Sequence, residues 1–450
     1  MHPLPTWLSR SAAAALALLI GAGGEAAAQS RVKFELWHGL SGDLGERVGD
    51  VCKRFNETQA EFEIACISQG SYDEAVQNSI AAFRAKKQPT IVQVFDAGTA
   101  DLMLSGAFYP AGKLMADNGF TVDWGRYFPG VANYYATSKG ELLSFPFNSS
   151  TALFYWNRDA FAKVGRSAAP TTWEEVEAIS RDLKKAGYAC PFAFEYDTWQ
   201  LMEQFSAIHG QPIATRGNGY EGLDAELVFN KTRFADYVKF LKKGYDEGIF
   251  SIKVKATGAT IGEAFGAGDC QMTQMSVASH GTIGKIAKPG MNWDVAMLPL
   301  FAGTKRTNSL VGGASLWALA GKSKDEYRGA AAFFNFIALP QSEEYWSTVT
   351  GYIPVTKPGF AFMKAKGFYD KPPYKGREIA LESLTASEVT PVSRGVRLGG
   401  FLLIRKETQD ALQAIFANSM SVEAGLNQAV ERGNAILRRF EKTYAGKQLP

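Results

Sequence analysis

Hydrophobic and polar residues in the first part of the chain follow the spacing of alternating strands and helices. We predict strands at residues 32–37, 62–67 and 90–95, the last apolar enough to be buried on both faces of a sheet. Capping-box patterns, Asp43-x-x-Glu46 and Ser71-x-x-Glu74, begin a helix after each of the first two strands. This alternation indicates an open α/β sheet, in which ligands bind beyond the carboxyl ends of strands. The residues there are Trp37-His38, Gly70-Ser71-Tyr72 and Asp96-Ala97-Gly98-Thr99.

The same pattern begins again after residue 146. We predict strands at residues 152–156, 190–194 and 271–276, and a helix that the capping box Thr172-x-x-Glu175 begins. The chain ends in a long amphipathic helix over residues 422–440. No internal repeat and no Pro/Ser-rich linker separates the two halves. We therefore expect two α/β lobes joined by short, direct crossings of the chain.

The first 28 residues carry an export signal. A basic start with His2 and Arg10 leads into a short apolar run, residues 12–20, and then into Ala26-Ala27-Ala28, an A-x-A cleavage site. That run is about half the roughly 20 residues that a membrane helix needs, and no comparable stretch follows. The cleavage site has no cysteine, so we do not expect a lipid anchor there. We expect cleavage after Ala28 and a free, monomeric protein in a bacterial periplasm.

The charge and the cysteine content indicate which partners to exclude and how the cysteines are used. The net charge is only +3, which argues against nucleic acid as a partner, and 46% hydrophobic residues are ample for two cores. The four cysteines lack C-x-x-C spacing, so in an oxidising compartment they are candidates for disulfides rather than metal ligands. We pair Cys52 with Cys66 and Cys190 with Cys270. Four buried free thiols remain the alternative, because cysteine is commonly buried whether bonded or not.

Motifs of catalysis are missing from the sequence. The histidines beyond the export signal, His38, His209 and His280, are not spaced as metal ligands. No G-x-S-x-G elbow, Walker loop or Rossmann fingerprint follows a predicted strand. Scattered carboxylates are most often solvated surface charges. The sequence therefore predicts a protein that holds a ligand without transforming it, with no catalytic residue, no metal and no cofactor.

Six short segments resemble a known family. They are Leu36-Trp37-His38, residues 145–151 (FPFNSST), residues 268–273 (GDCQMT), residues 312–317 (GGASLW), residues 350–354 (TGYIP) and residues 429–434 (AVERGN). In this order, over nearly the whole exported chain, they resemble the periplasmic sn-glycerol-3-phosphate-binding proteins of ABC importers. More widely, the chain is similar to the extracellular solute-binding proteins that include the maltose-binding type.

The resemblance implies an α/β clamp of two lobes, each an open, mostly parallel sheet flanked by helices, with three hinge crossings. Residues 29–146 and 290–348 would form the first lobe, and residues 147–289 and 349–450 the second. A small phosphorylated polyol would bind between them. Transmembrane permease subunits with a cytoplasmic ATPase would then receive it. The family's ligand contacts fall on Tyr72, Asp96, Ser150, Ser276, Gly313, Tyr352 and Arg405, and possible cleft aromatics are Trp37, Tyr196 and Trp199.

Each implied contact has a plain chemical role and a structural alternative. Arg405 would offer a planar fork of donors to the phosphate, and the Gly313 amide would approach closely because glycine lacks Cβ. The serines and Tyr352 would add neutral donors, and Asp96 and Tyr72 would bind the glycerol hydroxyls. Alternatively, Arg405 is a surface charge or salt-bridge partner, and Gly313 only permits a tight start to its strand. Ser149 and Ser150 could equally form a turn or a helix cap, and Tyr352, Trp37 and Trp199 could be ordinary packing residues.

Two positions depart from the family and bear on the ligand. Asp96 stands where the family has a glutamate, and Tyr196 stands where it has a first cleft tryptophan. A shorter acid and a smaller ring leave room for a glycerophosphodiester such as glycerophosphocholine, although water could fill the gap instead. The expected mechanism is capture by closure of the lobes. The alternatives are an oligosaccharide-binding protein, in which Trp37, Tyr196 and Trp199 stack on sugars, and a secreted glycerophosphodiester hydrolase.

Overall fold

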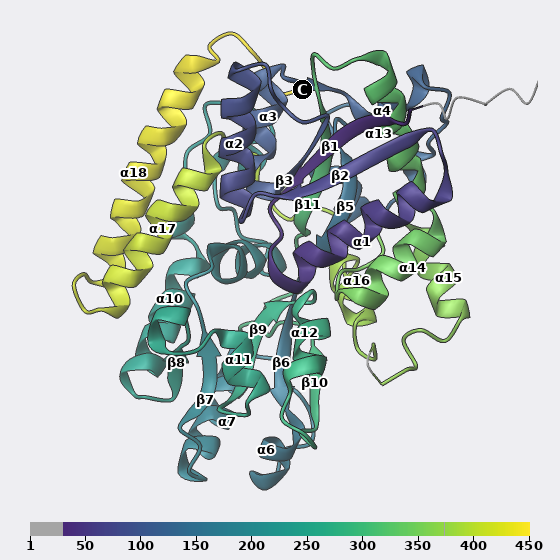
Figure 1. The fold of residues 1–450 in the computed structure, drawn as a ribbon. Helices are drawn as coiled ribbons and strands as arrows, with labels where there is room; N and C mark the ends of the chain where they lie inside the picture. Colours follow the sequence, from purple (N-terminus) through teal and green to yellow (C-terminus); the bar gives the residue numbers. More distant parts are fainter. Residues whose placement is uncertain (1–29, 373) are drawn as a thin grey trace, which may run out of the picture.

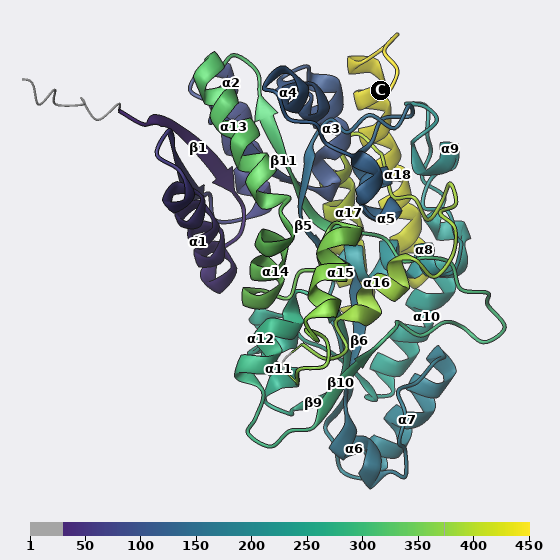
Figure 2. The ribbon, with the colours of Figure 1, turned by 90° about the vertical axis from the view of Figure 1, so that its right-hand side faces the viewer.

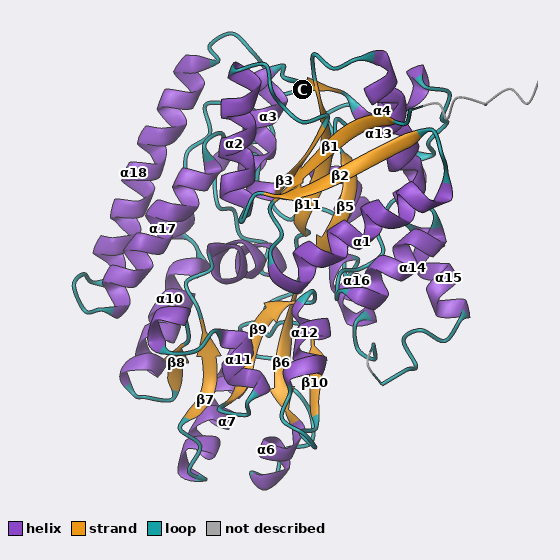
Figure 3. Ribbon diagram, viewed as in Figure 1, coloured by secondary structure: helices purple, strands orange, loops and turns teal. Residues whose placement is uncertain are grey.

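A computed structural model describes residues 30–372 and 374–450. The export signal predicted over residues 1–28 lies outside the described residues. Two lobes lie one above the other in Figure 1, and Figure 2 shows them from the side. In each lobe helices surround a central sheet (Figure 3). The two-lobed α/β architecture therefore agrees with the prediction.

The first lobe is built on a six-stranded sheet, ordered β2-β1-β3-β11-β4, with β5 pairing to β11. Its strands are β1 (Val32–His38), β2 (Phe62–Ser68), β3 (Ile91–Phe95), β4 (Phe108–Tyr109), β5 (Phe145–Ser150) and β11 (Gly312–Leu319). The early βαβαβ unit forms the parallel part, because β1 runs parallel to both β2 and β3. All five residues of β3 are buried, as its apolar sequence predicts.

Helices cover both faces of this sheet. They are α1 (Gly42–Thr58), α2 (Tyr72–Arg84), α3 (Thr99–Ser105), α4 (Ala111–Asp117), α5 (Pro129–Tyr135), α13 (Lys324–Ile337) and α14 (Pro340–Val349). On one face Phe55 of α1 makes edge contacts with Phe34 of β1 and Phe333 of α13. On the other face α2 packs against β3. Apolar side chains on both faces of the buried strands thus hold the helices in place.

The second lobe contains a five-stranded sheet in the order β10-β6-β9-β7-β8. Its strands are β6 (Ala152–Asn157), β7 (Cys190–Phe194), β8 (Phe250–Ile252), β9 (Cys270–Ser276) and β10 (Trp293–Ala296). Its helices are α6 (Arg158–Lys163), α7 (Trp173–Lys185), α8 (Phe205–Ile208), α9 (Thr215–Asn218), α10 (Arg233–Asp246), α11 (Ile261–Gly266) and α12 (Ser279–Ile286). Trp173 of α7 packs on Phe192 of β7 and on Tyr237 of α10, and all three are fully buried.

The chain passes between the two sheets at two places. Thr151 alone separates β5 of the first sheet from β6 of the second, and residues 297–311 lead back from β10 to β11. The remaining helices are α15 (Lys357–Ala365), α16 (Glu378–Leu384), α17 (Phe401–Phe416) and α18 (Val422–Thr443). Helices α17 and α18 pack on each other and on α10, and they extend along one side of the molecule to the first lobe (Figure 1). The third hinge crossing remains a prediction, because no strand follows β11 among the described residues.

Three details of the predicted architecture need correction. Strand β10, which the prediction placed in the first lobe, pairs with β6 of the second sheet. Ser150, predicted in the second lobe, ends β5 in the first sheet. Both sheets are mixed, because β11 runs antiparallel to β3 and β6 runs antiparallel to β9. Parallel pairing of consecutive strands needs a crossover connection, usually a helix. Strands β6 and β11 each come directly from the other sheet without such a helix, and they pair antiparallel.

Helix starts follow the sequence signals in most cases. Ser71 and Thr172 each cap a helix, accepting a hydrogen bond from the backbone of Glu74 and Glu175 respectively. The predicted cap at Asp43 is wrong: α1 begins at Gly42, and Asp43 instead pairs with Arg47 and, across the lobes, with Lys285 of α12. The long terminal helix is confirmed as α18.

Both predicted cysteine pairs are bonded in the structure. Cys52–Cys66 joins α1 to β2 in the first lobe, and Cys190–Cys270 joins β7 to β9 in the second. Each bond lies within one lobe. The disulfides therefore stabilise the lobes separately without joining one lobe to the other.

Candidate functional site

Arg405 lies at the junction of the two lobes, between two buried carboxylates. Its Nε donates to Glu203 Oε1 at 2.7 Å, and its Nη2 donates to Glu203 Oε2 at 2.8 Å and to Asp96 Oδ1 at 2.5 Å. Nη1 makes no hydrogen bond to any of the residues that the structure describes. Two acids thus hold the guanidinium through Nε and Nη2, and its open Nη1 edge carries no hydrogen bond to a described residue.

The three side chains reach this point from three separate elements. Asp96 follows β3 directly and begins a short 3₁₀ turn, η1 (Asp96–Gly98), in the first lobe. Glu203 lies in a π-helical turn, η3 (Trp199–Gln204), that packs against β9 of the second lobe. Arg405 lies on α17, which packs on α10 of the second lobe and touches η1 of the first. Arg405, on a helix that contacts both lobes, therefore joins Asp96 of the first lobe to Glu203 of the second.

Burial governs the electrostatics of this cluster. The side chains of Glu203, Asp96 and Arg405 are 1%, 6% and 14% exposed. Burial raises the pKa of Glu203 to about 7, although Arg405 counteracts it. Burial likewise raises the pKa of Asp96 above its ordinary value, again against the effect of Arg405. The two carboxylates raise the pKa of Arg405, so the guanidinium stays charged.

Tyr72 and Tyr352 adjoin this cluster on the side of the first lobe. Tyr72 begins α2, and its ring stacks on Phe95, the residue before Asp96, with ring centroids 5.1 Å apart. Its hydroxyl accepts a hydrogen bond from Asn148 Nδ2 at 2.8 Å. Burial raises the pKa of Tyr72, and the neighbouring hydroxyl of Tyr352 raises it further. Both phenols are therefore neutral hydrogen-bonding groups at the boundary of the lobes.

Asn148 links Tyr72 to the interior of the first sheet. Its Oδ1 accepts from Gln93 Nε2 at 2.7 Å, and Gln93 Oε1 in turn accepts from the backbone of Gly39 at 2.9 Å. Asn148 and Gln93 are fully buried. Because each amide is bonded at both ends, this chain of hydrogen bonds fixes the position of the Tyr72 hydroxyl.

Ser150 and Gly313 lie where β5 pairs with β11, close to Asp96. Ser150 pairs with Gly312, and Ala314 pairs with Phe95. Gly313 has a φ of +103°, and a Cβ there would overlap the carbonyl oxygen of Asn148. Glycine is thus required by the strand pairing itself, which supports the alternative of a tight start to the strand.

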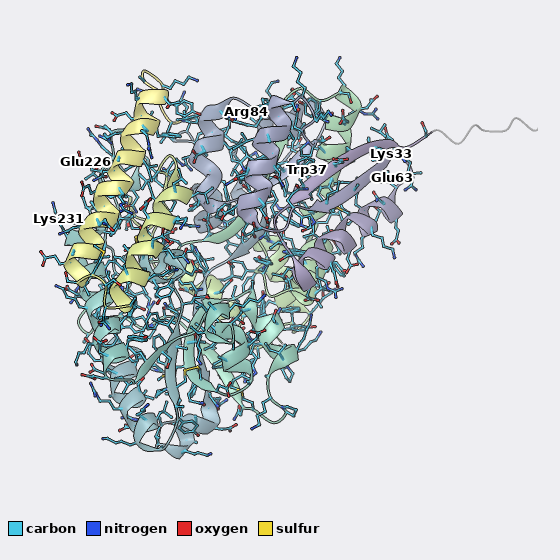
Figure 4. The ribbon with its side chains drawn as sticks, turned by 60° about the vertical axis from the view of Figure 1, so that its left-hand side comes forward. Lys33, Trp37, Glu63, Arg84, Glu226 and Lys231 are labelled. Carbon is cyan, nitrogen blue, oxygen red and sulfur yellow. A yellow bond between two sulfur atoms is a disulfide. The ribbon has the colours of Figure 1, made fainter. Side chains whose placement is uncertain are left out.

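Ser276 and the three predicted aromatics lie at different distances from this junction. Ser276 pairs with Ala152, just past the crossing at Thr151. Trp199 covers Gly312, where any Cβ would overlap its ring, and its Nε1 is buried without a partner among the described residues. Tyr196 packs on Phe416 instead. Trp37, labelled in Figure 4, donates a hydrogen bond from Nε1 to Glu35 on β1 of the first lobe. Of the three, only Trp199 contacts the junction.

Sequence reasoning missed Glu203 and Asn148. Glu203 lies in the segment WQLMEQ, in which three of the six residues are polar, so its sequence does not mark it as buried; in the structure all six residues are buried, and a buried acid is one that is paired. Asn148 lies within one of the quoted family segments but carries no charge to single it out. Their roles depend on contacts with residues far away in the chain, so spacing along the sequence does not reveal them.

Three other features of the described part of the chain concern metal sites, membrane-spanning helices and the titration of histidines. Residues 30–372 and 374–450 contain no group of three or more His, Cys, Asp or Glu side chains that could hold a metal ion. In the same residues no helix has the length and apolar character needed to cross a membrane. Burial lowers the pKa of His38, His209 and His280, so all three imidazoles are neutral at pH 7.

Comparison with known proteins assigns the chain to a family. The model of the bacterial extracellular solute-binding proteins matches residues 50–359. The chain belongs to this family. Its members bind solutes, so this solute-binding protein is not an enzyme. Proteins named sn-glycerol-3-phosphate-binding periplasmic protein UgpB are similar to it. Those of Salmonella typhimurium and Escherichia coli O6:H1 are 37% identical over 438 and 434 residues, 96% and 95% of this chain and 98% of theirs.

Solved structures show the same fold. UgpB from Mycobacterium tuberculosis in complex with glycerophosphocholine has a TM-score of 0.75 at 21% identity, covering 91% of this chain and 99% of that one. The sugar-binding protein MalE from Xanthomonas citri has a TM-score of 0.71 at 17% identity, covering 92% and 100%. The two-lobed architecture of the solute-binding protein is therefore that of UgpB and MalE.

Proposed function

We propose that this solute-binding protein captures sn-glycerol 3-phosphate, or a glycerophosphodiester such as glycerophosphocholine, in the periplasm and delivers it to the permease of an ABC importer. The observation that carries the proposal is the 37% identity to glycerol-3-phosphate-binding proteins over 96% of the chain. The open edge of Arg405 at the junction of the lobes supports it. Export with cleavage after Ala28, and action as a monomer, belong to the same proposal.

The chemistry of the junction suits a phosphate ester. Arg405 Nη1 offers two N–H donors to phosphate oxygens, and the phenols of Tyr72 and Tyr352 and the hydroxyls of Ser150 and Ser276 add neutral donors. At about 1.5–3 kcal/mol for each hydrogen bond to a charged group, several such bonds give the roughly 8 kcal/mol of a micromolar dissociation constant after ordering costs. No covalent step is needed.

Capture works by closure of the two lobes. Asp96, Tyr72 and Ser150 lie with the first sheet and Ser276 lies in the second, and Arg405 is on α17, which contacts both η1 and α10. A ligand that bonds to both sides stabilises the closed arrangement relative to the open one. Changing the closed population from about 1% to about 99% requires roughly 5.5 kcal/mol of preference, which a few charged hydrogen bonds supply.

A ligand panel tests the proposal. Thermal unfolding is measured with sn-glycerol 3-phosphate, glycerophosphocholine and maltose, and positive ligands go on to calorimetry. Ligand at 100 times its dissociation constant adds about 2.7 kcal/mol, which raises the Tm of a chain this long by about 3 °C. Stabilisation by a phosphate ester but not by maltose is expected. Stabilisation by maltose alone would favour the oligosaccharide alternative.

Arg405→Ala is the matched test of the site. It should lower the affinity for sn-glycerol 3-phosphate at least 100-fold in calorimetry, because one substitution removes the only cation bonded to Asp96 and Glu203 among the described residues. Arg432→Ala is the control, since Arg432 forms a similar but surface pair with Glu407. Unchanged affinity in a folded Arg405→Ala variant would remove Arg405 from the site.

A further inference from the structure

The Arg405 cluster contains more negative than positive charge. Glu203 and Asp96 together bring two carboxylates to one guanidinium, and Glu203 alone occupies both Nε and Nη2 with two nearly parallel hydrogen bonds. A single carboxylate would be enough to neutralise Arg405. The second one leaves the cluster with a net negative charge when both acids are ionised.

A phosphate ester has to approach this cluster as an anion. The open edge of Arg405 is the Nη1 side of the same guanidinium whose other edge the carboxylates occupy. A phosphate bound there would lie near two like charges in a buried site, where repulsion is screened poorly. Loss of one of the two carboxylate charges reduces this repulsion, and the simplest way to lose it is to bind a proton.

The surroundings of the two acids favour that protonation. The groups that face Asp96 and Glu203 electrostatically are Arg405 of α17, Asp197 before η3, and the phenols of Tyr72 of α2, of Tyr134 and Tyr135 of α5. Among these, only Arg405 is a cation, and Asp197 adds a third acid. Burial already raises the pKa of Glu203 to about 7, so a proton can be taken up near neutral pH.

We infer that capture of an anionic phosphate ester by this protein is accompanied by uptake of a proton on the Asp96–Glu203 carboxylates, with Glu203 acting as the positioning residue that holds Arg405. The inference rests on the proposed function and adds its proton coupling. The proton binds a carboxylate oxygen, so that Arg405 is left with one ionised acid and one anionic ligand. No bond of the ligand changes.

Calorimetry in two buffers of different ionisation enthalpy counts these protons. At pH 8 the probe sn-glycerol 3-phosphate is a dianion, because the second pKa of a phosphate monoester is about 6. We expect uptake of about 0.5 to 1 proton per ligand bound, and a dissociation constant that rises up to about tenfold per pH unit above pH 7. Glycerophosphocholine, whose phosphate does not titrate in this range, serves as a second probe.

Substitutions locate the proton. Glu203→Gln and Asp96→Asn each remove one of the two negative charges, so each should abolish the uptake and flatten the pH profile. Glu407→Gln, two residues from Arg405 on α17 but paired with Arg432 at the surface, should keep both. Tight binding by the unmodified protein without proton uptake would overturn the inference, as would undiminished uptake in both Glu203→Gln and Asp96→Asn. If neither phosphate ester binds at all, the proposed function itself falls.

Discussion

At the scale of single residues, the site combines groups with very different reasons for being there. Gly313 is fixed by the backbone, because its positive φ and the nearby Asn148 carbonyl exclude a side chain. Arg405 is fixed by charge, because two buried acids hold its guanidinium. Gly313 lies in one of the family segments, residues 312–317, whereas Arg405 lies in none of them. The contacts show that the strand pairing requires the first residue and that a pair of acids holds the second.

The requirement for glycine at position 313 can be measured. Gly313→Ala should lower the free energy of unfolding by about 2 kcal/mol more than Gly290→Ala does, because a side chain at 313 also overlaps a backbone oxygen. Gly290 is the matched control, since its φ is +81° and nothing lies within 4 Å of the point that a methyl group would occupy. Denaturant unfolding gives both values, and equal losses would contradict the packing explanation.

The length of the acid at position 96 should affect ligand choice. Asp96→Glu brings a longer side chain toward Arg405, to which Asp96 already bonds at 2.5 Å, and so fills space that a diester's second substituent would use. We expect the ratio of affinities to shift several-fold toward sn-glycerol 3-phosphate and away from glycerophosphocholine. Calorimetry with both ligands measures the ratio, with Asp410→Glu, at a surface pair with Lys406, as control. An unchanged ratio would show that residue 96 does not set selectivity.

At the scale of elements, most strands and helices follow from local sequence. The strands β1, β2, β3, β6, β7 and β9 and the helices α1, α2, α7 and α18 lie where hydrophobic periodicity and capping residues predict them. Strands β4, β8 and β10 are only two to four residues long and give no periodic signal. The antiparallel partner of β3 could not be predicted, because β11 follows all the strands of the second sheet in the chain. The same applies to Glu203, whose partner lies 202 residues away.

The two disulfides should differ in their contribution to stability. Cys190 and Cys270 are 80 residues apart, whereas Cys52 and Cys66 are 14 apart. On the chain-entropy model, replacing the first pair by alanine should cost about 1.5 kcal/mol more than replacing the second. Guanidinium unfolding of the two double variants tests this difference. Titration of the denatured parent protein should find no free thiols, and four would refute both bonds.

At the scale of the whole molecule, a few contacts join the two lobes. Besides Arg405 with Asp96, Lys285 of α12 pairs with Asp43 of α1 at 2.9 Å on the surface. Nearby, the backbone at Gly281 of α12 meets Thr350 at the end of α14 so closely that a Cβ would overlap its carbonyl oxygen. Polar contacts and close backbone packing therefore act together at the boundary of the lobes.

A larger residue at position 281 should weaken ligand binding, although Gly281 is not among the predicted ligand contacts. Gly281→Ala forces α12 away from Thr350 and so disfavours the closed arrangement, lowering the affinity for the phosphate ester by about tenfold. Gly284→Ala, on the same helix with nothing within 4 Å, is the control. Calorimetry measures the affinity, and small-angle scattering of the ligand-bound protein should show a larger radius for Gly281→Ala only. Equal behaviour of the two variants would contradict this account.

The position of β11 also determines when the first lobe can be completed. This strand pairs with β3, β4 and β5, yet it comes from residues 312–319, after the whole of the second sheet. In a chain that emerges with its amino terminus first, β3 has an unpaired edge until residues 312–319 have followed. The second sheet needs only residues 152–296 and can form earlier. The first sheet, whose strands begin the chain, can therefore be completed only after every strand of the second sheet has emerged, and Arg405 can join Asp96 only later still.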